Sequence, residues 1–521
     1  DGVVKNTTCD IIATKSIITS LYSPSCNPRR VKEKMSLEQK MADFFKFEEN
    51  DTNMQAEIRA GITTFLTMAY ILVVNPTFLN LGFTADPVTG VTLGIPFNEA
   101  LFATAMAAFV GCTIMGLWAN QPYAMAPGMG LNAYFAFTVV LGMGVPWELA
   151  LAAVLIEGII FLIISLPQIG WRTKMINSIP KELKIATMAG IGMFLAHIGL
   201  QEMGWVIGGA TLVDIGAHAT WTHQSGEIWA MIGLLAIGIM MARGYKGAII
   251  YGIAGVTGIA WIMGAMDMHV ADAYNGGVAV AAPAAGDIFS TDGFDTGAVG
   301  AALSALADLD SDTIGAFLLV MITFLFVDIF DTAGTLYGVG KMAGKVDEDD
   351  NLEGADEAFM SDAVATIAGA LCGTSTTTTY IESAAGIEEG GKTGLVAVVV
   401  GVMMLMGLFL SGLLQAIPAF AVAPALVVVG AMMMRGAAEI DWTDKEISIP
   451  AFITIVMMPL TYSIADGIAW GIIAYVVMKL GTGKKDQINA VMGTLCALMI
   501  MFYLGPGSET TFEWLINMAF E

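Results

Sequence analysis

The chain has 521 residues, of which 56% are hydrophobic and only 13% are charged. A soluble protein of this length would carry about 25% charged residues, so the composition excludes an ordinary soluble enzyme and indicates a polytopic membrane protein. The formal net charge of −24 excludes a nucleic-acid partner, because a polyanion repels nucleic acid. So many acidic residues also favour a halophilic source, where salt screens the repulsion between surface carboxylates.

The amino-terminal residues 1–34 have no starting Met and no apolar core long enough for a signal peptide. We therefore expect a disordered or artefactual extension, with the natural start at Met35. Residues 35–57 predict a short amphipathic helix on the cytoplasmic side of the membrane.

A transmembrane helix needs about 20 largely apolar residues. By this measure the sequence predicts an all-α polytopic protein with fourteen spans, near 58–80, 98–118, 122–143, 147–166, 181–200, 227–243, 247–266, 314–340, 359–372, 374–390, 394–417, 420–435, 448–463 and 464–480. A carboxyl-terminal extension over 481–521 contains one extra apolar segment, 487–505.

The basic residues orient these spans, because Lys and Arg are retained on the cytoplasmic side. If the amino terminus is cytoplasmic, then so are the span ends and adjoining loops that carry Lys184, Arg243, Lys341 and Arg435. Residues 267–313 contain eight Asp and no Lys or Arg, which predicts an acidic extracellular loop. This loop separates a first repeat of seven spans (58–266) from a second (314–480), and an odd number of spans inverts the second copy, giving a 7+7 inverted repeat.

The third span of each half is interrupted. The first opens NQPYAMAPGMGLNAYFAF (120–137), whose Pro and Gly residues prevent a regular helix. The second opens GTSTTTTYIESAAGI (373–387), whose Thr run favours extended backbone. Because backbone groups at membrane depth must be paired or line a polar cavity, we expect two short antiparallel β-strands. Each should lead into a half-helix whose free amides point at a binding site near the midplane.

Carboxylates within spans cost about 2.5 to 3.5 kcal/mol to insert, so each is a functional candidate. Asp328 and Asp331 lie three residues apart on one helix face, and Glu382 follows the Thr run. These three could hold a proton or accept hydrogen bonds from ring N–H groups. Glu157 is as compatible with a structural role, and Asp466 is expected to cap a helix.

Polar residues of the two interrupted spans complete the candidate substrate-binding set, although each alone is also compatible with packing. Asn132 offers both a donor and an acceptor, as a purine edge requires. Tyr380 offers an aromatic face and a backbone amide, and Gly130 and Thr379 lie in the same segments. The His and Cys residues have no metal-ligand spacing, and no nucleophile–base pattern is visible. We therefore expect no metal, no cofactor and no enzymatic activity.

Five segments carry a resemblance to a known family: AEIRAGITTFLTMAYILVVNP (56–76), APGMGLNAYFAFTVVLGMG (126–144), FVDIFDTAGTLYGVG (326–340), GTSTTTTYIESAAGIEEGGKTGL (373–395) and PAFITIVMMPLTYSIADGIAWGIIAY (450–475). The chain resembles the nucleobase/cation symporters, specifically the AzgA-like branch of adenine, guanine and hypoxanthine permeases. With the acidic composition, we expect a halophilic archaeon as its source. The resemblance implies a core domain (spans 1–4 and 8–11), a gate domain (spans 5–7 and 12–14) and a homodimer. It also implies proton-coupled uptake, with Asp331 and Glu382 contacting the base.

The expected function is therefore import of a purine nucleobase with protons across the cell membrane, by elevator-like alternating access. A uracil or xanthine permease of the same fold is an alternative. Anion exchangers of the sulfate and bicarbonate type share the architecture, but the acidic candidates disfavour an anionic substrate. An ion channel would instead show conductance without saturable uptake.

Overall fold

The computed structural model describes residues 37–80, 94–169, 179–209, 212–216, 225–266, 281–284, 286–310, 313–347 and 352–503. The chain divides into two compact units, 1–44 and 45–521. The first contains all but the last residue of helix α2 (Leu37–Phe45), which confirms the helix predicted within 35–57. The predicted extension 1–34 lies outside the described residues.

The second unit is mostly helical, and every predicted apolar segment contains a helix. The first half contains α3 (Met54–Met68), α4 (Ile71–Asn80), α5 (Phe97–Leu117), α6 (Met129–Ala133) with the π-helix η2 (Tyr134–Gly142), α7 (Trp147–Ser165), α9 (Lys181–Glu202), α10 (Gly226–Ala242) and α11 (Ala248–Ala265). The second half contains α13 (Ile314–Met342), α14 (Ala355–Cys372), α15 (Ser383–Glu388), α16 (Leu395–Met406), η5 (Gly407–Phe409), α17 (Ser411–Gln415), α18 (Ala419–Met433), η6 (Met434–Glu439), α19 (Lys445–Thr461), α20 (Ile464–Gly481), η7 (Lys485–Gln487) and α21 (Ala490–Tyr503). Among the described residues, eight helical segments are long and apolar enough to cross a membrane.

Four regions differ from the sequence-based expectation. The first predicted span is broken between α3 and α4, and the span predicted at 394–417 is divided among α16, η5 and α17. The described part of the predicted acidic loop contains η4 (Asp292–Phe294) and α12 (Ala301–Ala307), and α12 packs against α7 and α14 because its alanines allow close contact. The sequence reading also missed an antiparallel hairpin of β2 (Val206–Gly209) and β3 (Leu212–Ile215).

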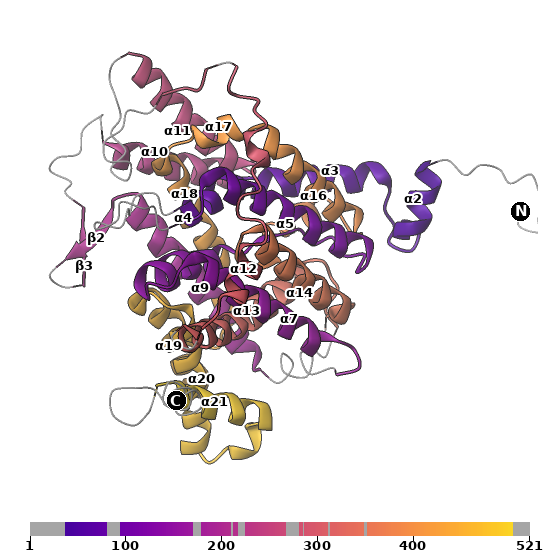
Figure 1. Ribbon diagram of the computed structural model, residues 1–521. Helices are drawn as coiled ribbons and strands as arrows, with labels where there is room; N and C mark the ends of the chain where they lie inside the picture. Colours follow the sequence, from indigo (N-terminus) through magenta and orange to yellow (C-terminus); the bar gives the residue numbers. More distant parts are fainter. Residues whose placement is uncertain are drawn as a thin grey trace, which may run out of the picture. The chain divides into compact units, whose positions relative to one another are not determined.

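The long helices of the second unit pack as two groups (Figure 1). In the first group, α5 contacts α4, α14 and α16, α7 contacts α13 and α14, and α3 contacts α16. In the second group, α9 contacts α18 and α19, α10 contacts α11 and α18, and α19 contacts α20. Glycines permit the close approach of α9 and α18, since a Cβ at Gly430 would lie 2.3 Å from the Gly192 carbonyl oxygen. Helix α13 joins the groups through contacts with α9 and α20.

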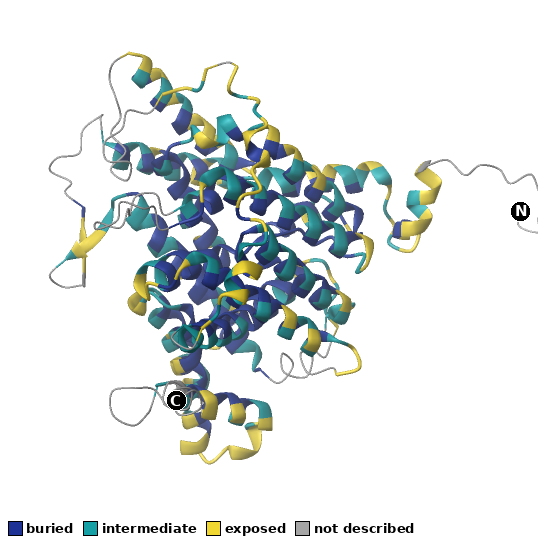
Figure 2. Ribbon diagram, in the orientation of Figure 1, coloured by how far each residue is buried: buried dark blue, intermediate teal, exposed yellow. Residues whose placement is uncertain are grey.

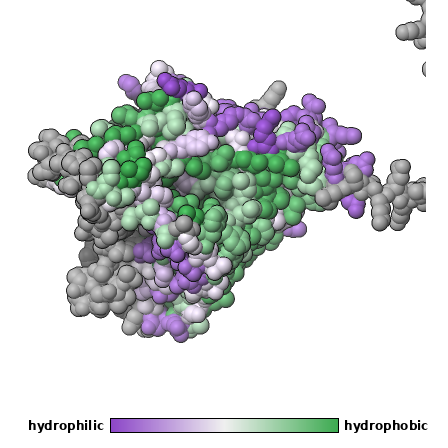
Figure 3. All heavy atoms as spheres, turned by 90° about the horizontal axis from the view of Figure 1, so that it is seen from above, coloured by the Kyte–Doolittle hydropathy of each residue, from purple (hydrophilic) through white to green (hydrophobic). Residues whose placement is uncertain are grey.

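Burial and hydropathy agree with a lipid-facing protein. Buried residues concentrate in the interior of the second unit, and exposed ones are frequent around α21 (Figure 2). Figure 3 shows a broad apolar face with polar residues at its margins. Large apolar side chains that are at least half exposed include Leu235, Ile239, Tyr251, Ile262, Phe452 and Val477. Such a surface would be unfavourable in water and is stable against hydrocarbon.

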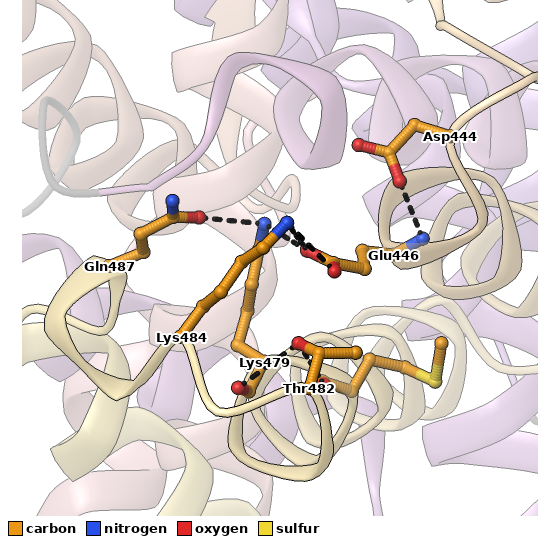
Figure 4. A network of polar contacts seen from close by, with 7 residues as sticks. Asp444, Glu446, Lys479, Thr482, Lys484 and Gln487 are labelled. Atoms are coloured by element: carbon orange, nitrogen blue, oxygen red, sulfur yellow. Dashed lines mark hydrogen bonds and ion pairs between the residues drawn. The ribbon is translucent and has the colours of Figure 1, made fainter.

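An ion-pair cluster joins the first turn of α19 to the end of α20 (Figure 4). The Glu446 carboxylate lies 2.9 Å from both the Lys479 and the Lys484 ammonium, and Lys479 also donates to the Gln487 Oε1 at 2.9 Å. Glu446 lies outside the predicted span 448–463. Hydrogen bonds from the two lysines lower its pKa to about 2. The cluster therefore holds the α19–α20 hairpin with a carboxylate that stays ionised in mild acid.

Candidate functional site

Two short strands cross in the interior of the first group. Strand β1 (Met125–Pro127) pairs antiparallel with β4 (Thr377–Thr379), with Met125 opposite Thr379 and Pro127 opposite Thr377. The pairing extends beyond both strands, because the Gly128 amide donates to the Thr376 carbonyl and the Tyr380 amide to the Ala124 carbonyl, each at 2.9 Å. All six strand residues are buried. The predicted pair of strands is confirmed, and pairing satisfies the backbone groups that hydrocarbon would leave without partners.

A small cavity adjoins this crossing and lies between the two helix groups. Its volume is about 40 Å³, room for about three water molecules. The first group lines it with Gly128, Met129, Gly130, Asp331, Thr335, Thr378, Thr379, Tyr380, Ile381 and Glu382, and the second with Ile191, Leu195, Val429 and Met433. Its polar and ionisable groups therefore all come from one side.

Two buried carboxylates face the cavity from different elements. Glu382 is 2% exposed at the start of α15, and its Oε1 accepts a hydrogen bond from the Tyr70 hydroxyl at 2.5 Å. Asp331 is 6% exposed on α13, and its Oδ2 lies beside Gly128, where a Cβ would be 3.6 Å away. Residues 51 positions apart are thus brought to one site. Nothing in the sequence pattern singled out Tyr70, which lies at the break between α3 and α4.

Comparison with known proteins agrees with this architecture. The Xan_ur_permease family model, described as "Permease family", matches residues 55–470. The chain belongs to this permease family. It is 40% identical over 465 residues to the guanine/hypoxanthine permease PbuG of Bacillus subtilis, covering 89% of this chain and 99% of that protein. It is 36% identical over 463 residues to the adenine permease AdeP of Escherichia coli, covering 88% and 94%.

The fold of the permease is also similar to a solved structure. The transmembrane domain of the cyanobacterial bicarbonate transporter BicA superposes with a TM-score of 0.56 at 14% identity, over 79% of the permease and 97% of that domain. This similarity shows a shared, mostly helical fold. The family model and the apolar helices identify the permease as a multi-pass membrane protein.

Tyr380, Gly130 and Thr379 line the cavity of the permease, as the sequence predicts for binding residues. The Tyr380 hydroxyl donates to the Pro127 carbonyl at 2.5 Å. Its backbone amide is engaged in the strand pairing, so it is not available to a substrate, contrary to expectation. A Cβ at Gly130 would lie 3.0 Å from the Ile191 side chain, so glycine lets the half-helix α6 approach α9.

Asn132 and Asp328 do not line the cavity. Asn132 is fully buried, donates to the Pro127 carbonyl at 3.2 Å and accepts a hydrogen bond from Ser375. It thus links α6 to the segment that precedes β4.

Asp328 belongs to a buried polar network behind the cavity wall. The Thr332 hydroxyl lies 3.4 Å from Asp328 Oδ1, 2.8 Å from Asp362 Oδ2 and 3.1 Å from the Thr378 hydroxyl. Asp362 on α14 is fully buried and was missed by the sequence reading. The cost of inserting a carboxylate into hydrocarbon would have singled it out, as it did Asp328.

Other expectations need correction. Asp466 is not the helix cap: Ser463 caps α20 by accepting from the Asp466 amide at 3.2 Å, and the Asp466 carboxylate instead accepts from Tyr503. The first amides of α15, at Ser383, Ala384 and Ala385, donate to carbonyls three residues earlier and are not free.

Glu157 on α7 is fully buried and does not line the cavity. Within the described residues, no cluster of three or more His, Cys, Asp or Glu could hold a metal.

Proposed function

We propose that this permease imports purine nucleobases, namely hypoxanthine, adenine and guanine, together with protons across the cell membrane. The observation that carries the proposal is that Asp331 and Glu382 face one buried cavity in a chain related to guanine/hypoxanthine and adenine permeases. Carboxylate oxygens accept the hydrogen bonds that purine ring and amino N–H groups donate. Tyr380 adds an aromatic edge, and Thr378 and Thr379 add hydroxyls.

Proton coupling is assigned to the acids Asp328, Asp331 and Glu382. A carboxyl group in this buried site is costly when ionised without a partner. Binding a proton and a neutral base together would therefore be more favourable than binding either alone. The network through Thr332 connects Asp328 with the cavity residue Thr378 and offers a route by which a proton could be shared.

The two helix groups support an elevator-like mechanism. The first group corresponds to the proposed core domain (spans 1–4 and 8–11), and the second to the proposed gate domain (spans 5–7 and 12–14). The gate side of the cavity offers only apolar side chains, so the core can move past it without breaking hydrogen bonds to substrate. A cavity of about 40 Å³ must widen to admit a base, as alternating access requires.

The remaining topology belongs to the same proposal: fourteen spans, inverted repeats over 58–266 and 314–480, an acidic extracellular loop at 267–313, a cytoplasmic amino terminus and a homodimer in the bilayer. Lys184, Lys341 and Arg435 lie near the ends of three helical segments, next to loops predicted to be cytoplasmic, and they line a single cavity. Their common location supports the proposed orientation.

Two alternatives have specific support. The family model's name makes xanthine or uracil a reasonable substrate. The fold is shared with a bicarbonate transporter, but two carboxylates in the cavity oppose an anionic substrate by like-charge repulsion.

Uptake into proteoliposomes would test the function. We expect saturable uptake of labelled hypoxanthine that is accelerated by an inwardly directed proton gradient and inhibited by excess adenine or guanine. Inhibition by uracil or xanthine alone would favour the first alternative. Uptake of bicarbonate or sulfate without any purine uptake would overturn the proposal. Purine uptake that is unaffected by the proton gradient would show that transport is not coupled to protons.

A further inference from the structure

The hydroxyl groups that face the small cavity differ in where their hydrogens go. The lining residues that carry a hydroxyl are Thr335, Thr378, Thr379 and Tyr380. The Thr335 hydroxyl donates to the Asp331 carbonyl at 2.9 Å, and the Tyr380 hydroxyl donates to the Pro127 carbonyl. Because a carbonyl oxygen can only accept, these two hydroxyls keep one direction and offer lone pairs to a substrate.

Thr378 contacts a second hydroxyl instead of a carbonyl. Its oxygen lies 3.1 Å from the Thr332 hydroxyl, and either of the two could donate. Thr332 also lies 2.8 Å from Asp362 Oδ2 and 3.4 Å from Asp328 Oδ1. A hydroxyl has one hydrogen, and an ionised carboxylate only accepts. When either carboxylate takes the Thr332 hydrogen, Thr378 must donate to Thr332 and presents only lone pairs to the cavity.

Thr332 is placed by packing between three elements. Threonines inside helices commonly donate to the carbonyl four residues earlier, as Thr335 and Thr323 of the same helix do. The Thr332 hydroxyl on α13 instead contacts side chains of α13, α14 and β4. Thr332, Asp362 and Thr378 are each at most 2% exposed, so bulk water does not replace these contacts.

A proton on Asp362 would reverse this chain of hydrogen bonds. A protonated carboxyl group can donate, so Asp362 could donate to Thr332 and Thr332 to Thr378. The Thr378 hydrogen would then be free to point into the cavity. Thr378 would change from acceptor to donor without movement of any heavy atom. Purine bases carry both N–H donors and ring acceptors, so the two directions suit different edges of the base.

Other buried acids lie on the elements around Asp362. Helix α14 packs against α5 and α7 and reaches α13 through Thr332. The buried titratable residues of these three helices are Asp328, Asp331, Glu157 and Cys112. The elements α12, β1 and β4 also contact α14 and contain no titratable residue. Because neighbouring acids can exchange a proton, Asp362 must be substituted by itself to identify the carboxyl group that governs Thr332.

We propose that Thr332, anchored by Asp362, is a positioning residue that sets whether the Thr378 hydroxyl accepts or donates a hydrogen bond in the nucleobase site. Neither Thr332 nor Asp362 lines the cavity, so both act on the base through Thr378. The inference rests on the proposed nucleobase function and deepens it, because it ties recognition of the base to the uptake of a proton.

A double-mutant cycle on the full-length protein in proteoliposomes would test the proposal. Valine keeps the shape of threonine and lacks the hydroxyl. We expect Thr332→Val and Thr378→Val each to raise KM for labelled hypoxanthine about tenfold. The double variant should match Thr378→Val within about twofold, because residues that act through one contact are not additive. Thr332→Ser restores the hydroxyl and should stay within about twofold of wild type.

Thr323→Val is the matched control. Thr323 is a buried threonine of the same helix whose hydroxyl donates to the Leu319 carbonyl, and it does not line the cavity. It should change KM less than about twofold. Unfolding temperatures should be the same for all variants, and the same cycle with alanine keeps the test decisive if a valine variant unfolds.

Asp362→Asn tests the role of the proton. The amide keeps an acceptor oxygen for Thr332 but cannot be protonated at this site. We expect KM for hypoxanthine within about threefold of wild type, with the stimulation of uptake by an inward proton gradient reduced at least about fivefold. Full stimulation in this variant would reject the reversal of the hydrogen bonds.

The remaining outcomes separate this proposal from the function on which it rests. Valine effects that multiply to about 100-fold would show that Thr332 acts independently of Thr378 and would overturn the proposal. A Thr332→Ser variant as impaired as Thr332→Val would assign the loss to packing and also overturn it. No hypoxanthine uptake by the wild-type protein would instead overturn the nucleobase function.

Discussion

The two sides of the small cavity differ in chemistry although both are helical and buried. The first group offers carboxylates, hydroxyls and a tyrosine, held by crossing strands and by hydrogen bonds from Tyr70 and Thr332. The second offers Ile191, Leu195, Val429 and Met433. This asymmetry separates recognition, which needs fixed polar groups, from movement, which needs a surface that forms no hydrogen bonds with the substrate. Changes on the polar side should therefore affect transport more than changes on the apolar side.

The largest effect is expected from Glu382→Gln. The amide keeps the shape and can still accept from Tyr70, but it cannot take up a proton or carry a charge. We expect hypoxanthine uptake to fall by about 100-fold or more, which corresponds to about 3 kcal/mol, with the unfolding temperature unchanged. Glu388→Gln, at an exposed position six residues later, is the matched control and should transport normally. If the Glu382→Gln variant took up hypoxanthine at the wild-type rate, this carboxylate would have no role in transport.

A smaller effect is expected from Tyr70→Phe, which removes the hydroxyl that donates to Glu382 at 2.5 Å. Losing a hydrogen bond to a carboxylate costs about 1.5 to 3 kcal/mol, so kcat/KM for uptake should fall about tenfold or more. Tyr245→Phe alters a tyrosine that is 58% exposed and should have no effect. Equal kinetics for both variants would mean that Tyr70 does not position Glu382.

The apolar side should tolerate truncation better. Ile191→Ala removes part of the surface opposite the half-helix α6, and we expect KM to rise about fivefold, equivalent to about 1 kcal/mol, with kcat nearly unchanged. Ile239→Ala, at a 56% exposed position on α10, is the control. A loss of uptake as large as that of Glu382→Gln would contradict the proposed division between the two sides.

The smallest effect on transport is expected from Glu446→Gln, in the ion-pair cluster, since Glu446 lines neither the small cavity nor the larger one that contains Lys184, Lys341 and Arg435. Because the folded-state pKa is about 2 and an unperturbed Glu titrates near 4.3, the stabilisation is complete above about pH 5. It is lost as the pH falls through that interval toward 2. The variant should unfold a few degrees lower at pH 7 with unchanged KM. The difference should shrink as the pH falls from about 5 toward about 2 and vanish only below the folded-state pKa, where Glu446 is protonated in both states. A difference of undiminished size at pH 2 would exclude charge as its cause.

Much of the fold and part of the site follow from local sequence. The apolar segments and the broken third span of each half were predictable because hydrocarbon penalises every unpaired backbone group and charge. The same penalty directed attention to Asp331 and Glu382, which the structure brings to one cavity. The same insertion penalty applies to Asp362, which lies in the predicted span 359–372. The sequence therefore contained the evidence for this carboxylate, although we did not select it.

Other features have no local signal. A polar residue that faces a cavity and one that hydrogen-bonds to a neighbouring segment have the same sequence pattern. The sequence therefore predicted Asn132 as a binding residue and Asp328 as a proton-coupling residue, although neither lines the cavity. Tyr70 and Ile191 look like ordinary residues of apolar helices until the folded chain places them beside Glu382 and Gly130.

The sequence by itself therefore determined that this protein is embedded in lipid, where its helical segments and paired strands lie, and that Asp328, Asp331 and Glu382 are carboxylates that hydrocarbon should exclude. Only the tertiary structure decided which carboxylates face the same cavity, which apolar residues oppose them, and that Lys184, Lys341 and Arg435 line one larger cavity. The physical reason is that the insertion cost of a residue is set largely by its type and by its position within an apolar segment, and both can be read from the local sequence. A cavity depends on contacts between helices far apart in the chain, and a single sequence does not record them.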